Sequence, residues 1–184
     1  MERLAPSARS DSYGSRVGRE HSTVLASSLP WLLIVAGSVL PVFLIATALP
    51  IVPPLGFIIF ICWRMVRPGL LPVWAGVPLG AVDDLFNGQP FGFAILFWSL
   101  SVLALDAVEA RFPWRSFLSD WITAALLVVI YILAGIVLSG AALSQPLFIA
   151  AVPQLLLSIL SVPVAARLVS AFDRLRLRRW RRAE

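Results

Sequence analysis

Two long stretches without charge most constrain how this chain can fold. No charged residue occurs between Ser22 and Trp63, and none occurs between Trp121 and Ala166. A transmembrane helix needs about twenty consecutive apolar residues to cross a hydrocarbon core of roughly 30 Å. The mean hydropathy of the 184 residues is +0.89 and only 14% of them are charged, too few to cover a soluble domain. The pattern predicts an all-α, polytopic integral membrane protein.

The net charge of +5 is carried by arginine alone, at the chain ends and in short gaps between apolar runs. This distribution is typical of topology determinants, whereas a nucleic-acid site needs a basic face on a folded domain, so we expect no nucleic-acid partner. Cys62 and His21 are the single residues of their types, which argues against a disulfide and a zinc site. About 28 polar residues precede the first apolar run, which is not typical of a cleavable signal peptide.

The apolar runs and their breaks predict six spans, the second of them short. We place these spans at 29–49, 51–63, 70–86, 91–108, 119–138 and 146–169. They form one membrane domain over residues 29–172. We expect residues 1–28, rich in Ser, Arg and Gly, to be a disordered cytoplasmic tail, with a docking peptide as the alternative. Residues 173–184 form a basic cytoplasmic tail, which is either attracted to anionic membrane lipid or serves as a plain topology anchor.

The run at 51–63 is too short to cross an average bilayer unaided. It could cross where the bilayer thins, begin inside a cavity, or form one arm of a re-entrant hairpin. If it crosses, both tails and the arginines near 64–67 and 111–115 share one side, whereas five spans would divide the arginines between the two sides. Because positive residues are retained in the cytoplasm, the pattern favours six spans with both termini cytoplasmic and short uncharged loops outside.

The third span carries the least typical residues. Gly76 and Gly80 are four residues apart and share one helix face, which Asp84 continues. Small residues at this spacing let two helices approach closely, and Pro78 removes one helical N–H between them. A carboxylate at Asp84, roughly 21 Å along the span, needs compensation. The helix could end near Val82, with Asp83 or Asp84 bonded to the backbone of the Asn87–Gly88 turn. Alternatively, Asp84 could bond to a neighbouring helix of this chain or of a partner, or take part in a proton or cation relay.

Charged residues also cluster at the end of the fourth span. Asp106 and Glu109 are three residues apart and share a face, where they oppose the negative end of the helix dipole. We expect them to pair with arginines such as Arg111, Arg64 or Arg67. The interpretation is a structural charge clamp on the cytoplasmic side, with a partner site as the alternative.

Residue sets that carry catalysis are absent from the sequence. No serine in the spans has a histidine available, and neither an HExxH motif nor a Walker-type phosphate loop occurs. Intramembrane proteolysis would need Ser and His, or two separated Asp residues in characteristic loops. We therefore expect a non-enzymatic protein without a metal or cofactor.

The segment 80–96, GAVDDLFNGQPFGFAIL, resembles the most characteristic region of the rod shape-determining protein MreD family. That region has a glycine, an aspartate four residues later, a short turn, an apolar–glycine pair and a leucine-rich helix. These places are occupied here by Gly80, Asp84, Gly88, Gly92 and Leu96. The length, the short second span and the arginines that flank the spans agree with the family in outline, whereas the long N-terminal tail exceeds the family's usual start.

The resemblance implies a bacterial inner-membrane protein of the cell-elongation machinery, with a fold similar to the substrate-binding membrane subunits of energy-coupling-factor vitamin transporters. It would bind the membrane-anchored scaffold MreC and, with the actin-like MreB, the glycosyltransferase and the transpeptidase, help to localise peptidoglycan synthesis. The surface expected to pack against a partner helix consists of Gly76, Gly80, Asp84, Gly88 and Gly92. A membrane subunit that binds a small vitamin-type solute is the alternative, although polar residues such as Gln154 are few in the spans.

Overall fold

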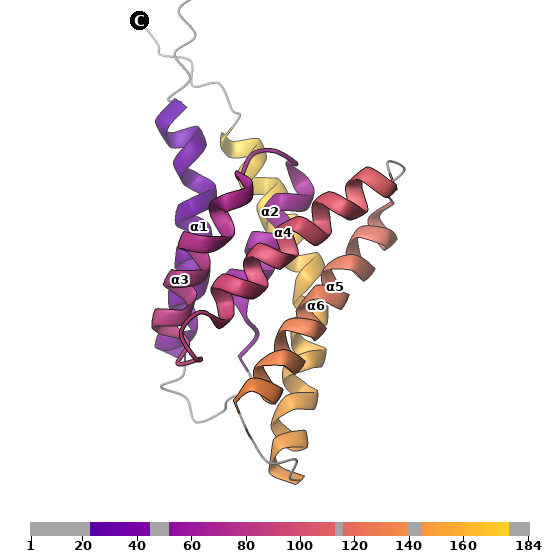
Figure 1. Ribbon diagram of the computed structural model, residues 1–184. Coiled ribbons are helices and arrows are strands. Elements are labelled where there is room, and N and C mark those ends of the chain that lie inside the picture. Colours follow the sequence, from indigo (N-terminus) through magenta and orange to yellow (C-terminus); the bar gives the residue numbers. More distant parts are fainter. Residues whose placement is uncertain (1–22, 45–51, 113–115, 140–144, 177–184) are drawn as a thin grey trace, which may run out of the picture.

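The computed structural model describes residues 23–44, 52–112, 116–139 and 145–176, and this part of the chain is helical without any strand (Figure 1). Its elements are α1 Thr23–Leu44, α2 Leu55–Val66, the 3₁₀ helix η1 Val73–Ala75, α3 Gly76–Phe86, α4 Phe93–Arg111, α5 Phe117–Leu138 and α6 Gln145–Arg176. Helical structure therefore extends beyond both predicted limits of the membrane domain. Most of the two predicted tails, residues 1–22 and 177–184, lies outside the described residues.

Three helices are long and apolar enough to cross a membrane, namely Phe93–Arg111, Phe117–Leu138 and Ala151–Leu175. Two further apolar helical stretches, Ser27–Phe43 and Leu55–Val66, are shorter. The prediction of an all-α fold is confirmed for the described residues, and the apolar helices are those of a membrane protein. Because three helices meet the length and hydropathy of a membrane span within the described residues, the count of six spans is not supported there.

The predicted third span, 70–86, is interrupted at its start. Gly69 adopts a φ of 81°, so the chain turns after α2 before a new helix begins. The short η1 then leads into α3, which has only 11 residues. Pro78 consequently lies in the first turn of α3, where a missing N–H costs little, and not in the interior of a helix that begins at residue 70.

The short helix α2 forms the core of the bundle. It packs against α1, α4, α5 and α6, and Figure 1 shows it between α1 and α6. Phe57, Phe60 and Trp63 on this helix are fully buried. At Gly56 an added Cβ would lie 2.1 Å from the Ser38 Oγ, so the glycine permits close contact with α1. Because protein surrounds α2, this helix is not required to match the thickness of a bilayer on its own.

A non-helical segment, residues 52–54, leads into α2. Pro53 and Pro54 have no N–H group to leave unpaired, and the Val52 carbonyl accepts a hydrogen bond from Gln154 Nε2 of α6 at 3.1 Å. In a membrane protein, irregular backbone is tolerated where it is buried in protein or lines a cavity. Since residues 52–54 line a cavity, the arrangement fits the predicted alternative in which the second run begins inside one.

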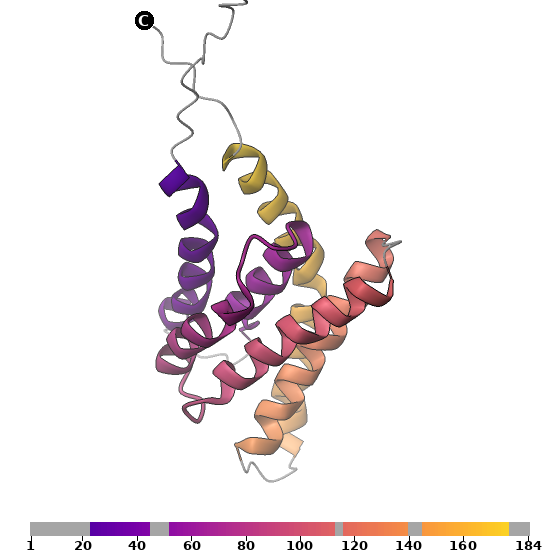
Figure 2. The same ribbon diagram turned by 45° about the horizontal axis from the view of Figure 1, so that its top comes forward.

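The described chain begins and ends at the same end of the bundle (Figures 1 and 2). The start of α1 and the end of α6 lie there, together with the α2–α3 connection and the end of α4. The α3–α4 turn lies toward the opposite end, because successive helices alternate in direction. We refer to the first as the arginine end, since it carries Arg67, Arg111 and Arg174.

Candidate functional site

Two glycines shape the connection between α3 and α4. Gly88 has a φ of 65° and Gly92 a φ of 98°, a region of backbone conformation that costs other residues roughly 1–2 kcal/mol. Asn87 ends α3, and Gly92 directly precedes the first residue of α4. The sequence from Asn87 to Gly92 therefore closes a tight turn. We call this turn, with the last turn of α3 and the first turn of α4, the α3–α4 corner.

Asp84 fastens the corner to α4. Its carboxylate accepts three backbone N–H bonds at the start of that helix, from Gly92 at 2.8 Å, Ala94 at 2.7 Å and Ile95 at 3.4 Å. The N-cap residue of α4 is glycine, which has no capping side chain, so Asp84 supplies the acceptor from another helix. The carboxylate also faces the positive end of the α4 dipole. Asp84 thus bonds both to the turn and to a neighbouring helix of the same chain.

Asp83 faces a different part of the protein. It accepts hydrogen bonds from the Tyr131 hydroxyl of α5 at 2.9 Å and from Asn87 Nδ2 at 2.7 Å. Asp83 is 2% exposed and Asp84 is 5% exposed, so both carboxylates are removed from solvent. Adjacent side chains of a helix point about 100° apart, so the Asp83 carboxylate can bond to α5 while the Asp84 carboxylate bonds to α4.

The glycine face of α3 lies directly against the backbone of α4. A Cβ added at Gly76 would lie 2.8 Å from the Ser99 nitrogen, and one added at Gly80 would lie 2.7 Å from the Ile95 Cα and nitrogen. These are distances that real β-carbons essentially never adopt. The close helix approach predicted from the spacing therefore takes place within this chain, and α4 covers the face that was expected to receive a partner helix.

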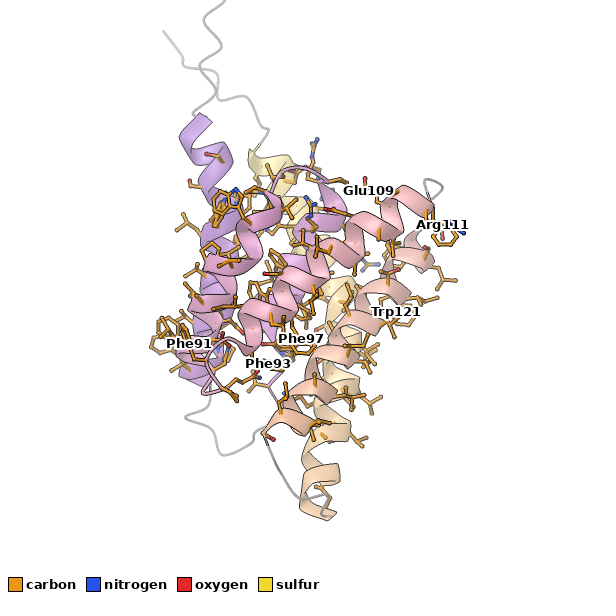
Figure 3. All side chains as sticks on the ribbon, viewed as in Figure 1. Phe91, Phe93, Phe97, Glu109, Arg111 and Trp121 are labelled. Carbon is orange, nitrogen blue, oxygen red and sulfur yellow. The ribbon has the colours of Figure 1, made fainter. Side chains whose placement is uncertain are left out.

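Aromatic rings enclose the Tyr131 side chain. The Phe57 ring stacks on Tyr131 at a centroid distance of 4.3 Å, and the Phe93 ring lies at 5.1 Å. Phe97 meets the same ring edge to face at 6.2 Å, and Figure 3 shows Phe93 and Phe97 at the start of α4. Tyr131 and Asp83 are each 2% exposed, so the bond between them lies in a region of low dielectric, which strengthens it.

A cavity of about 350 Å³ opens beside the corner, between residues 52–54, the turn and α5. Its polar lining includes Asn87, Gln89, Tyr131 and Gln154. The Gln89 Oε1 atom is buried and has no hydrogen-bond partner within the described residues. The volume falls in the range of small-molecule pockets, so the cavity could hold a small polar ligand.

At the arginine end, the buried Arg64 joins three segments of the chain. Its Nη2 donates to the Asp106 carboxylate of α4, and its Nη1 donates to the Leu71 carbonyl at 2.9 Å. Arg67 Nε donates to the Asp173 carboxylate of α6 at 2.9 Å. These bonds hold α2, α4 and α6 together at this end.

Of the predicted charge clamp, Asp106, Glu109 and Arg111, only Asp106 forms an ion pair among the described residues. Asp106 forms an ion pair with Arg64, one of the three arginines expected as partners. Glu109 and Arg111 lie near the end of α4, as Figure 3 shows, and neither takes part in an ion pair with another described residue. Residues two apart on a helix do not face each other, so Arg111 is badly placed to pair with Glu109.

Sequence reasoning did not single out Tyr131, and for Asp83 it offered only a bond to the backbone of the Asn87–Gly88 turn. The two residues are 48 positions apart, so no local pattern connects them. One signal was available, because a tyrosine in an uncharged apolar run usually finds a hydrogen-bond partner when it is buried. The carboxylates at a depth similar to that of Tyr131 along the predicted spans were Asp83 and Asp84, and only packing could decide between them.

Replacing Tyr131 with phenylalanine removes the hydroxyl and keeps the stacked ring. We expect a loss of about 1–3 kcal/mol of stability, because the buried Asp83 carboxylate loses the Tyr131 hydroxyl as a donor. Thermal unfolding of the purified protein in detergent, followed by tryptophan fluorescence, measures the change. An Asn87→Ala variant removes a different donor to the same carboxylate and serves as the comparison. Equal stability of Tyr131→Phe and the unchanged protein would contradict a role for this bond.

No protein-family model, curated protein or solved structure matches the chain. Among the described residues, no group of three or more His, Cys, Asp or Glu side chains could hold a metal ion. The arrangement joins α3 to α4 through Asp84 and to α5 through Asp83, and it leaves a polar cavity beside the turn. Chemically, it is suited to fixing a corner of the bundle and to holding a small ligand.

Proposed function

We propose that the protein is a non-enzymatic inner-membrane component of the bacterial cell-elongation machinery, which binds MreC and helps to organise peptidoglycan synthesis. The α3–α4 corner supports this proposal, because each of the residues that resemble the MreD motif has a definite structural role in it. Gly80 lies against α4, Asp84 caps that helix, and Gly88 and Gly92 permit the turn. Because these residues pack against or bond to α4 and the turn, the outward side of the corner remains available to a partner.

The outward side of the corner is apolar. Leu85 is 70% exposed and Phe91 is 72% exposed, with Phe86 between them in sequence and also exposed. Figure 3 labels Phe91 at the tip of the corner. Because α4 covers Gly76 and Gly80, we assign the MreC contact to the corner surface formed by Leu85, Phe86 and Phe91. Large apolar and aromatic side chains of this kind are the usual anchors of an interface.

The proposal includes six spans with both termini in the cytoplasm. It is supported by helices that alternate in direction and by the arginines gathered at one end, since positive residues are retained in the cytoplasm. In a Cys62→Ala background, a cysteine at Ser139 should react with a membrane-impermeant maleimide in intact cells. A cysteine at Phe112, which is exposed at the arginine end, should react only after lysis. The reverse pattern would overturn the assigned orientation.

Copurification with MreC tests the function directly. The tagged protein should retain MreC in mild detergent, and its depletion should change the width of rod-shaped cells. Leu85→Ala with Phe91→Ala should lower the amount of MreC at least roughly tenfold, since truncation of two anchors costs more than about 1 kcal/mol each.

The matched control is Leu126→Ala with Ile130→Ala, two exposed apolar residues of α5. This variant should retain MreC as the unchanged protein does. Equal retention by both double variants would reject the corner surface. Absence of MreC from the unchanged protein, together with normal rods after depletion, would reject the elongation function itself.

A vitamin-type solute-binding subunit is the second candidate, and the cavity of about 350 Å³ favours it. Its polar lining, with Gln89 Oε1 unpaired within the described residues, offers groups that could orient a small solute. Saturable uptake, or a small molecule retained by the purified protein and lost in Gln89→Leu, would promote this candidate over the first.

A further inference from the structure

A second cavity, of about 530 Å³, opens at the arginine end between α2, α5 and α6. Its walls come from the last half of α2, the first two turns of α5 and the last half of α6. These segments lie in the half of the bundle nearer the arginine end (Figure 1). No residue lines both this cavity and the one beside the α3–α4 corner. It therefore lies where these helices would leave the bilayer, on the opposite side of the protein from the corner.

The interior of this cavity is apolar. The cavity is open where the side chains that line it are small, as at Ala124 and Ala166, and Trp121 forms one wall. Trp121 Nε1 donates to the Ile159 carbonyl at 3.3 Å. That carbonyl lacks its usual helical donor because residue 163 is proline, so the indole both satisfies it and is held in place. Figure 3 shows Trp121 on α5, in the half of that helix nearer the arginine end.

The lining of the cavity also carries cationic groups. Arg167 and Arg174 are seven residues apart on α6, close to two helical turns, so they share the face that borders the cavity. Both are exposed and can reach a ligand from outside. Asp120 is the one carboxylate in the lining, so the two arginines leave an excess of one positive charge.

We propose that this cavity binds an anionic phospholipid from the leaflet at the arginine end, with an acyl chain along the apolar interior and the phosphate beside Arg167 and Arg174. Basic pockets between membrane helices on the cytoplasmic side bind such headgroups. A free anion would leave the apolar wall unused, and an uncharged chain would leave the arginines unused. A phospholipid of negative charge matches both parts at once.

Native mass spectrometry of the full chain in mild detergent tests the proposal. Dioleoylphosphatidylglycerol should bind as one retained molecule, at least about fivefold more tightly than dioleoylphosphatidylethanolamine. Arg167→Gln and Arg174→Gln should each weaken binding about fivefold, the factor expected for one arginine near an anionic headgroup. Ala166→Leu, which fills the interior without changing charge, should also reduce retention.

Arg111→Gln is the matched control, because it removes one exposed arginine at the same end outside the cavity. It should leave retention unchanged. An equal loss in Arg111→Gln and Arg167→Gln would indicate diffuse attraction and overturn the site, as would equal binding of the two lipids. Displacement of the lipid by inorganic phosphate at the same concentration would show that the site takes a phosphate group alone. The arginine variants change only exposed side chains, so the result does not depend on whether Ala166→Leu folds.

Discussion

The Asp84→Leu variant is expected to unfold at a clearly lower temperature than the unchanged protein, with a loss of stability on the order of 3 kcal/mol. The substitution leaves the backbone N–H groups of Gly92, Ala94 and Ile95 without their acceptor in a largely buried setting. Each buried donor without a partner costs about 1–3 kcal/mol, and no side chain of the α4 N-cap can replace the carboxylate. The measurement is thermal unfolding of the purified protein in a single detergent.

Two variants show whether this loss arises from capping. Asp84→Asn keeps one acceptor oxygen and should fall between Asp84→Leu and the unchanged protein. Leu85→Ala changes the next residue, which is exposed, and should melt close to the unchanged protein. Membrane insertion is expected to persist in Asp84→Leu, whereas recruitment of MreC should weaken because the corner surface is displaced. An unfolding curve that matches the unchanged protein would rule out the capping role.

The helices of this protein were largely predictable from sequence, but their lengths and neighbours were not. Apolar runs and arginine gaps located both ends of α4 and α5 and the start of α6 to within three residues, whereas α6 continues to Arg176, beyond the predicted end of its span at residue 169. The predicted start of the third span was too early. The turn at Gly69 and the extended backbone at Pro72 precede the first helical residue, and hydropathy does not distinguish these apolar turn residues from a helix. The central position of α2 was also hidden, since a fully buried helix and a lipid-facing helix have equally apolar sequences.

The features of the candidate site that depend on spacing within α3 were predictable from sequence. The spacing of Gly76, Gly80 and Asp84 indicated close helix packing and a carboxylate that needs a partner, and both features are present. The partners themselves depend on contacts between helices. Residues that are 48 positions apart, such as Asp83 and Tyr131, meet only when α5 packs beside the corner. The cavities at the two ends likewise arise from the packing of several helices.

Gly80→Ala is expected to separate α3 from α4 and to cost about 1–3 kcal/mol, and Gly80→Leu is expected to cost more. The added β-carbon would lie 2.7 Å from backbone atoms of Ile95. Backbone of a helix cannot rotate away as a flexible side chain can, so the two helices must move apart. That movement also lengthens the bonds from Ala94 and Ile95 to Asp84, which couples this change to the loss of the cap.

Gly135→Ala provides a control with the same chemical change. A Cβ at Gly135 in α5 would meet only side-chain atoms, the nearest 3.6 Å away on Phe93, which is ordinary contact. Alanine favours a helix over glycine by up to about 1 kcal/mol, so this variant should be as stable as the unchanged protein or more so. Thermal unfolding of both variants in the same detergent gives the comparison. Equal melting temperatures for Gly80→Ala and Gly135→Ala would contradict the backbone contact between α3 and α4, because an added methyl group at Gly80 could then be accommodated as easily as one at Gly135.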